Sequence, residues 1–329
     1  MQAGLNSWYQ ADLAAMFPRR VIAKSLCAKK DEEEALLFVL DQMAVWSGRQ
    51  YEGRPIAAAI GFDRAIKASE VNFHDVCHDD FSAVMSNGFD TMVVCDFIGR
   101  IAGHEQLEHP EAPPSFAPNR LQAIAQWAEN ERVAVVLNRS GDILIFRSRE
   151  LVFARRSGRW HYLKHAPLLT QMGRPSDMDV RTAIYESALD ASFARTGACI
   201  GLVVAAQNNK WRSVATSASD YLSPAHSKKA KALAAMIADR PFHKLDRRLR
   251  QELLAIDGAT ILDHKGRILA VGAILKVEGG SSGGGRLAAA KALSKLGMGI
   301  KVSQDGRIQA FREGEDEILD PVEEIFRIM

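Results

Sequence analysis

The chain has 329 residues, of which 47% are hydrophobic and 25% are charged. These proportions are typical of a folded globular protein and exclude disordered, collagen-like and disulfide-scaffold proteins. The 42 lysines and arginines nearly balance the 40 aspartates and glutamates, and the net charge of +2 gives no support for nucleic-acid binding.

Cysteine usage and hydropathy indicate where the protein works. Four widely spaced cysteines without a C-x-x-C pair predict reduced thiols: Cys27, Cys77, Cys95 and Cys199. The longest apolar run, Ala198 to Ala206, is far shorter than the roughly 20 residues that cross a bilayer. Residues 1–18 lack the uninterrupted apolar region of a secretory signal. We therefore expect a cytoplasmic protein that does not enter a membrane.

In the first half of the chain, helical periodicity over 33–45 precedes a buried strand over 55–60. A second short strand covers 90–96, and its hairpin returns through Gly99-Arg100-Ile101. A helix then opens at Arg120, and residues 135–146 predict another hairpin.

The second half begins after a region rich in Pro, Gly and Asp, 167–179, which predicts a linker. A helix over 181–193 and a strand over 197–206 follow, and then a longer helical region over 224–254. The remaining elements are a strand over 260–263, its turn at 264–266, a strand over 268–275, and a helix over 286–296 with Gly297 at its C-terminal cap.

Two segments of the chain resemble each other closely enough to indicate a tandem repeat. An aspartate, another aspartate six residues later, and Gly-Arg-Ile three residues further occur from Asp90 to Ile101 and again from Asp257 to Ile268. The match continues from 135–146 to 300–311, with the glycines and phenylalanines at equal offsets. Repeats of this kind are decisive for the architecture.

The alternation of strands and helices in both halves predicts an α/β protein, and the hairpins make each sheet mixed. We therefore expect two mixed-sheet α/β domains in tandem. The first covers 1–168 and includes an N-terminal helical extension, and the second covers 178–329.

The most unusual composition is the glycine-rich loop from Glu278 to Arg286, which lies between a strand and a helix. Its last glycines, Gly283, Gly284 and Gly285, would let backbone N–H groups approach a ligand, and the helix N-terminus and Arg286 favour an anion such as phosphate. A flexible connection with an exposed arginine explains the composition equally well.

Asp257-Gly258-Ala259 lies just before a buried strand. At the edge of a sheet this carboxylate could hold a divalent metal or accept a proton from a sugar hydroxyl. Taken alone, an aspartate before a glycine is more often a turn residue.

Two further segments favour structural interpretations. The run from His74 to His78 has metal-ligand residue types but no second cluster at zinc spacing. The basic and aromatic residues from Arg155 to His161 are of a kind that binds single strands, although a solvated edge hairpin is the commoner explanation.

Residues 180–315 resemble the diadenylate cyclase (DAC) domain family. The resemblance rests on Asp257-Gly258-Ala259, the Gly266-Arg267-Ile268 turn, the glycine loop that leads into Arg286, and the turn that begins at Ser303. It implies that the D-G-A motif supplies an acidic group acting with Mg²⁺ or Mn²⁺ near the 3′-hydroxyl of ATP. It also implies that an R-H-R motif at a helix start binds the phosphates, that two domains face each other, and that cyclic di-AMP is the product.

The sequence departs from the family where the phosphates bind. Gly284 and Gly285 replace the first Arg and the His of R-H-R, so that only Arg286 remains, and Ser303-Gln304-Asp305 replaces the S-E-E-like turn. In the first copy Asp90-Thr91-Met92 replaces D-G-A, and Ser115–Asn119 precedes Arg120. Loss of a cationic clamp removes charge stabilisation where pyrophosphate would leave.

We therefore expect a nucleotide-binding, non-catalytic DAC-like sensor of bacterial signalling or defence, with ATP or a cyclic dinucleotide as ligand. The alternatives are an active diadenylate cyclase and a relic scaffold that binds no nucleotide. Self-association or an effector protein is expected as a partner. The expected nucleotide site comprises Asp257, Gly258, Ala259, Gly283, Gly284, Gly285, Arg286 and Ser303, with Asp257 as the metal and catalytic residue only if the protein is active. Asp90 and Arg120 would form a vestigial site.

Overall fold

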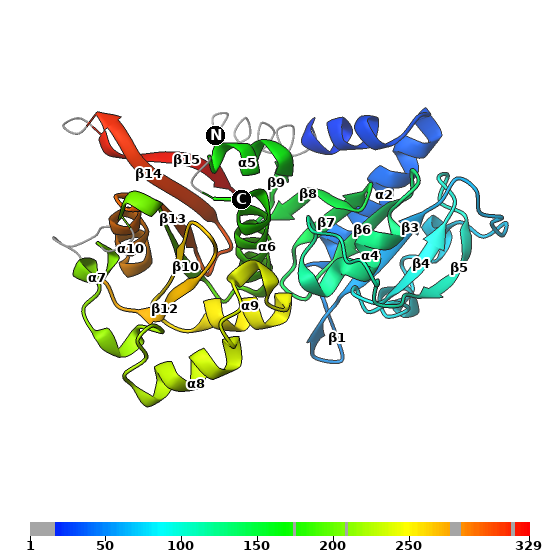
Figure 1. Cartoon of the computed structure of the whole chain (residues 1–329). Helices are drawn as coiled ribbons and strands as arrows, with labels where there is room; N and C mark the ends of the chain where they lie inside the picture. The colour runs from blue at the N-terminus through cyan, green and yellow to red at the C-terminus, as the bar shows by residue number, and fades with distance from the viewer. Residues whose placement is uncertain (1–16, 174–175, 208–209, 277–283, 317–319) are drawn as a thin grey trace, which may run out of the picture. The chain divides into compact units, whose positions relative to one another are not determined.

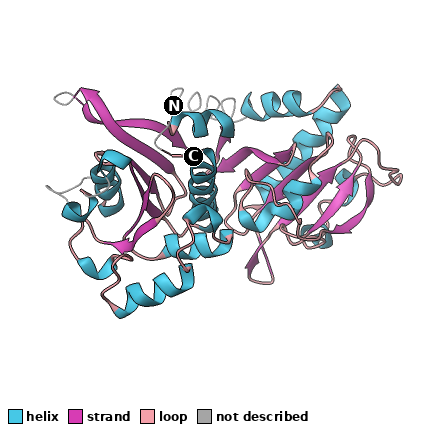
Figure 2. Cartoon of the chain, viewed as in Figure 1, coloured by secondary structure: helices cyan, strands magenta, loops and turns pink. Residues whose placement is uncertain are grey.

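The computed structural model describes residues 17–173, 176–207, 210–276, 284–316 and 320–329. The chain divides into two compact units, Met1–Leu163 and Lys164–Met329, and both combine helices with a mixed sheet (Figures 1 and 2). The α/β class expected from the sequence is confirmed.

The first unit is built on a seven-stranded sheet in the order β5-β4-β3-β6-β7-β8-β9. Only β3 and β4 are paired in parallel; the other neighbours in this sheet are antiparallel. The strands of the unit are β1 Gln50–Tyr51, β2 Arg54–Pro55, β3 Ala58–Phe62, β4 Thr91–Cys95, β5 Ile101–Gln106, β6 Val133–Leu137, β7 Ile143–Arg147, β8 Glu150–Arg156 and β9 Arg159–Tyr162.

Helices cover both faces of this sheet because the side chains of each buried strand alternate between the faces. Leu36, Leu40 and Met43 of α2 pack with Ile60 and Val135 on one face. On the other face Trp127 of α4 lies against Gly61. The helical segments are α2 Lys30–Trp46, α3 Phe73–Val76 and α4 Gln122–Trp127, with 3₁₀ turns η1 Asp80–Ala83 and η2 Asn119–Leu121.

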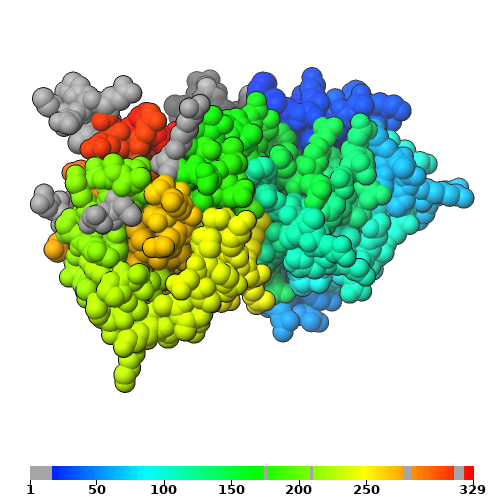
Figure 3. Space-filling view, in the orientation of Figure 1, coloured from blue at the N-terminus to red at the C-terminus, as the bar shows by residue number. Residues whose placement is uncertain are grey.

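The second unit is built on a six-stranded sheet in the order β12-β11-β10-β13-β14-β15. Its strands are β10 Ala198–Val203, β11 Ala259–Asp263, β12 Ile268–Ala273, β13 Gly297–Val302, β14 Ile308–Asp316 and β15 Asp320–Ile328. Its helices are α5 His165–Gln171, α6 Met178–Ala194, α7 Trp211–Val214, α8 Lys228–Ile237, α9 Arg247–Ala255 and α10 Gly285–Ser294, with 3₁₀ turns η3 Ala205–Gln207, η4 Ala218–Asp220 and η5 Phe242–Lys244. Helix α8 lies on the surface of the unit, at the lower edge of Figure 3.

The order β5-β4-β3-β6-β7-β8 in the first sheet corresponds to β12-β11-β10-β13-β14-β15 in the second, and β9 is an additional strand. Ile60 of β3 is opposite Val93 of the parallel strand β4, as Ile200 of β10 is opposite Thr260 of β11. The antiparallel pairs that follow in each unit also correspond, and a bulge falls at the same place in both, before Phe146 of β7 and before Phe311 of β14. The repeat that the sequence predicts is therefore present in the strand pairing.

The turn inside each repeat also has the same hydrogen bonds. Oδ1 of Asp96 accepts from the N–H groups two and four residues later, and Oδ1 of Asp263 does the same. The reversal places Gly99 at φ 86° and Gly266 at φ 78°, in the left-handed region that glycine tolerates. This explains why the Asp-to-Gly spacing is identical in both copies.

The structure differs from the expected linker. Helix α5 extends from His165 into the 167–179 region, ends at Gln171, and belongs to the second unit, which begins at Lys164. Nδ1 of His165 lies 2.8 Å from Oη of Tyr185 in α6, and Nη1 of Arg181 donates to the carbonyl of Leu169 at 3.0 Å. These contacts hold α5 on α6, which the local Pro and Gly content does not reveal.

Several element ends also differ from the predictions. Pro55 belongs to the β1–β2 hairpin, and β3 starts only at Ala58. The 224–254 region contains two helices, α8 and α9, separated by the 3₁₀ turn η5. Helix α10 ends at Ser294, and Gly297 is the first residue of β13 rather than a helix cap. Arg120 lies in the 3₁₀ turn η2, not in the first turn of an α-helix.

No helix within the described ranges is long and apolar enough to cross a membrane.

Candidate functional site

The predicted residues of the second unit lie at one end of its central strands, and this end of the sheet is the edge referred to below. Strands β10 and β11 are parallel and both begin at this edge, and β13 is antiparallel to β10 and ends there. Gly197 and Asp257 each lie three residues before the paired residues Ile200 and Thr260. Ser303 follows Val302, which is paired with Ala198. Asp257, Gly197 and Ser303 therefore lie just outside three neighbouring strands, at the end of the sheet where β10 and β11 begin.

Arg286 reaches the same edge from the start of α10. Its Nη1 atom lies 2.6 Å from the position that a Cβ would occupy on Gly197. Gly197 has φ 67°, so both its backbone conformation and the space above it require glycine. The Arg286 side chain thus extends from the first turn of α10 to Gly197, at the end of the sheet where Asp257 lies.

The charges at this edge are available to a ligand. Asp257 is exposed and Arg286 is partly exposed. Among the described residues, neither side chain forms an ion pair or a side-chain hydrogen bond, and the two do not pair with each other. A carboxylate and a guanidinium at one edge without partners suit a ligand that carries both hydroxyl and phosphate groups.

Gly258 and Ala259 have structural roles in the D-G-A motif. Gly258 has φ 105°, and a Cβ there would lie 2.5 Å from the carbonyl carbon of Gly272 in β12. Ala259 is buried and begins β11. The two residues let β11 and β12 approach closely, and this approach fixes the backbone that carries Asp257.

Lys229 of α8 is a cation near this edge that sequence reasoning missed. A Cβ placed on Gly272 would lie 2.9 Å from the Nζ atom of Lys229 and 2.9 Å from the carbonyl oxygen of Asp257. Lys229 donates to Asp220 at 2.8 Å. Lys229 lies in a helical stretch inserted between β10 and β11, so its spacing from Asp257 gives no signal in the sequence. Gly197 was also missed, although a glycine between a helix and a strand is a recognisable turn signal.

The glycine loop is described only in part. Gly283 lies outside the described residues. Gly284, with φ 82°, is the N-terminal cap of α10, and Gly285 is its first residue; both are exposed, and a Cβ on either would meet no atom of the described residues within 4 Å. The positive end of the α10 dipole lies beside Arg286.

Ser303 begins the turn between β13 and β14. Its N–H donates to the carbonyl of Arg307 at 2.8 Å, and its carbonyl accepts from Gly306 at 2.9 Å. The side chain is partly exposed at the edge described above.

The corresponding aspartate of the first unit is engaged within its own loop. Asp90 accepts a hydrogen bond from the amide of Asn87. Oδ1 of Asn87 accepts from the backbone N–H groups of Phe89, Asp90 and Thr91. Arg120 is exposed on η2. Asp90 therefore stabilises the turn before β4, in contrast to Asp257.

Asp257 is the carboxylate that the sequence predicts as a ligand of a divalent metal. No group of three or more His, Cys, Asp or Glu side chains with the geometry of a metal site occurs among the described residues, including those around His74 and His78. Mg²⁺ commonly binds through one or two carboxylates together with substrate phosphates. Asp257 fits that arrangement only when a bound nucleotide supplies the other oxygen ligands.

Comparison with known proteins gives limited similarity. No protein-family model matches the chain, and no curated protein matches it. Part of the chain is similar to a solved structure described as a hypothetical membrane spanning protein from Bacillus cereus, with 17% identity and a TM-score of 0.28 over 39% of this chain and 57% of that one. The chain therefore spans little more than half the length of that protein. A double mutant of DacA from Staphylococcus aureus matches with 14% identity and a TM-score of 0.30, over 45% of this chain and 86% of DacA.

Proposed function

We propose that the second unit is a DAC-like nucleotide-binding domain that senses its ligand without converting it. The observation that carries this proposal is the position of Arg286 against Gly197, at the end of the sheet where Asp257 lies two residues before β11. The sequence resemblance to the DAC family implies that Asp257 and Arg286 act in ATP recognition.

The chemistry of the edge suits a nucleotide. The guanidinium of Arg286 and the N-terminal end of α10 would bind phosphate oxygens. The Asp257 carboxylate would accept a hydrogen bond from a ribose hydroxyl, and with Mg²⁺ or Mn²⁺ it would supply one protein ligand to a metal that the phosphates also bind. Gly284 and Gly285 would leave room for the phosphates.

The same two glycines argue against cyclisation of ATP. Attack of a 3′-hydroxyl on an α-phosphate expels pyrophosphate, and the developing negative charge needs fixed cationic donors. Arg286 is the one residue of the family's R-H-R motif that this sequence retains. Binding without turnover follows from this loss, and a sensor of ATP or a cyclic dinucleotide in bacterial signalling is the function that fits.

Titration calorimetry of the full chain with ATP and with cyclic di-AMP tests the binding. Arg286→Ala should weaken binding of the true ligand by one to two orders of magnitude, since a charge-assisted contact contributes about 1.5 to 3 kcal/mol. Arg248→Ala is the matched control, because Arg248 is an exposed arginine of α9 in the same unit, with 81% of its side chain accessible. Equal affinities of wild type and Arg286→Ala would contradict the proposal, and binding of neither nucleotide would favour the relic scaffold.

Incubation with ATP and Mg²⁺ or Mn²⁺, followed by nucleotide chromatography, tests the absence of turnover. We expect no cyclic di-AMP. Formation at about 1 per second or faster, a rate typical of enzymes, would establish the active cyclase instead. Asp257→Asn would then abolish the product if the activity belongs to this chain and would leave it unchanged if it came from a contaminant.

A further inference from the structure

The first unit has a hairpin that the second unit lacks. Between α2 and β3 the chain inserts residues 47–57, which contain β1 and β2, whereas only residues 195–197 join α6 to β10. Tyr51 is paired with Arg54, and the turn between them consists of Glu52 and Gly53, both at positive φ. A two-residue turn of this conformation matches the twist of its strands, so the hairpin is well defined.

This hairpin forms one wall of a pocket of about 480 Å³. Such a volume lies within the range of small-molecule sites. The remaining walls come from the segment that leads into β3, from residues 83–87 before β4, and from Arg139 after β6. The pocket therefore lies at the edge of the first sheet that corresponds to the Asp257 edge of the second. Neither Asp90 nor Arg120 lines it.

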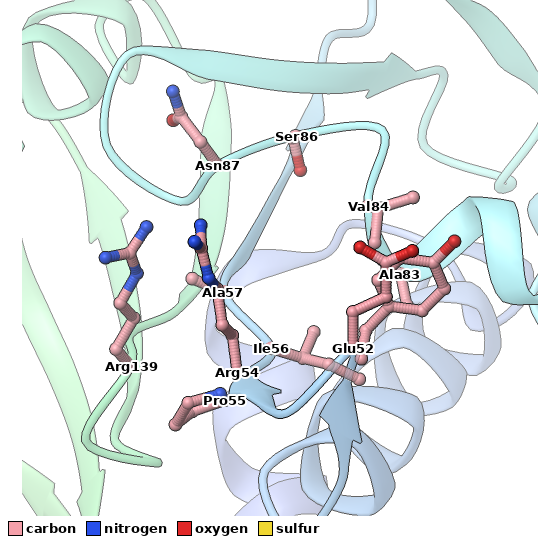
Figure 4. A pocket seen from close by; sticks show the side chains of 11 residues that line it. Glu52, Arg54, Pro55, Ile56, Ala57, Ala83, Val84, Ser86, Asn87 and Arg139 are labelled. Carbon is pink, nitrogen blue, oxygen red and sulfur yellow. The ribbon is translucent and has the colours of Figure 1, made fainter.

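Two arginines give the pocket its charge. The side chains of Arg54 and Arg139 come from different elements and extend toward the segment that carries Asn87 (Figure 4). Among the described residues no carboxylate lies within ion-pair distance of either guanidinium. Glu52 is on the other side of the pocket, near Val84. Two unpaired guanidinium groups on one side favour a doubly charged oxyanion, and phosphate is the group that arginine binds in bidentate fashion.

The backbone that carries these groups is fixed by hydrogen bonds. Oδ1 of Asn138 accepts from the N–H groups of Ser140 and Asp142 and so closes the turn that presents Arg139. Oγ of Ser86 accepts from the N–H of Ala59 at 2.8 Å, which joins the opposite wall to β3. The two walls therefore keep their positions without a ligand, which lowers the entropic cost of binding.

The geometry points to a second ligand site in this chain: a phosphorylated ligand of mononucleotide size binds beneath the β1–β2 hairpin, with its phosphate on Arg54 and Arg139. The apolar surface of Ile56 and Val84 and the ring of Tyr51 would contact the nucleoside, and the Glu52 carboxylate would accept from a hydroxyl or amino group on that side. This site is independent of the nucleotide site proposed at Arg286.

A fluorescent reporter in the pocket tests this assignment. Tyr51→Trp, in the full chain, places an indole in the pocket wall, and its emission is read by difference from the wild-type chain during titration with AMP, ATP and sodium pyrophosphate. We expect a saturable change with AMP or ATP, and affinity for pyrophosphate at least tenfold weaker. Equal affinities for AMP and pyrophosphate would overturn the nucleotide assignment, since phosphate alone would then be recognised.

Charge variants in the reporter chain locate the phosphate. Arg54→Ser and Arg139→Ser should each weaken binding about tenfold, and the double variant about a hundredfold. Arg159→Ser is the control, because Arg159 is an exposed arginine on the edge strand β9 of the same unit. Arg286→Ala should leave the Trp signal unchanged, which separates this site from the proposed function. A missing signal, or one that persists in the double variant, would overturn the assignment.

Discussion

The guanidinium of Arg286 occupies the space that a side chain on Gly197 would fill, with Nη1 2.6 Å from that Cβ position. A glycine just before β10 thus determines where an arginine at the start of α10 is held. Asp257 lies two residues before β11, at the same end of the sheet, so this contact places Arg286 at the end where Asp257 lies.

Gly197→Ala should displace Arg286 and weaken nucleotide binding about tenfold, the loss expected for one misplaced charge-assisted contact. It should also cost about 1 kcal/mol in stability, because Gly197 has positive φ. Gly158→Ala is the control, since Gly158 has φ 78° and a Cβ there would meet no atom of the described part of the chain within 4 Å. Calorimetry and thermal unfolding of both variants check this; if Gly197→Ala binds nucleotide like Gly158→Ala, the contact does not matter for binding.

Gly299→Ala should destabilise the second unit strongly. A Cβ on Gly299 would overlap the backbone of Ala290 in α10, so the helix would have to move away from the sheet. We expect a loss of about 1 to 3 kcal/mol, as in overpacked cores. The equivalent residue of the first unit is Ala134, which is buried, and Ala134→Gly should cost no more than about 1 kcal/mol. Urea denaturation distinguishes the two; similar losses would show that α10 can shift easily.

Arg247→Ala should be among the most destabilising single changes in α9. Its Nε and Nη2 atoms donate to Asp190 of α6 at 2.7 and 2.9 Å, and Asp190 is only 2% exposed. Removal of the arginine leaves a buried carboxylate without this partner, at a cost of about 3 to 5 kcal/mol. The neighbouring Arg248→Ala removes an exposed pair to Glu252 and should change stability by less than about 0.5 kcal/mol. Urea denaturation that gives equal midpoints for the two variants would contradict this.

Alkaline pH should destabilise the second unit through Cys199. Burial raises the pKa of this thiol from 9.0 to about 12, so the folded state favours the neutral thiol. Its contribution is complete below pH 9 and is lost as the pH rises toward 12, because the unfolded chain releases the proton first. Between pH 8 and 10.5 the loss should be about 2 kcal/mol. Cys199→Ala should show a smaller fall of the unfolding free energy over that interval, and an equal fall in both proteins would exclude the thiol as its source.

Sequence spacing predicted the repeated part of the fold because that part depends on local turn chemistry. Asp263 hydrogen-bonds the N–H groups just after it, and Gly266 takes the positive φ of the same turn. These interactions span only a few residues, so their spacing is visible in the sequence and recurs at Asp96 and Gly99. A short apolar run similarly indicated β11, and apolar residues at spacings of three indicated α10, with errors of a few residues at the ends of these elements.

By itself, then, the sequence determined the α/β class and the repeated units, and it predicted Asp257 and Arg286 as candidate site residues. Only the tertiary structure decided that Arg286 lies against Gly197, and that the Asp257 side chain has no hydrogen-bond or ion-pair partner among the described residues. The physical reason is that strand pairing and helix packing join residues far apart along the chain, whereas turn and cap preferences act over a few residues. The pocket beneath the β1–β2 hairpin also depends on tertiary structure. Arg54 and Arg139 line it together because β2 and the end of β6 lie at one end of the sheet.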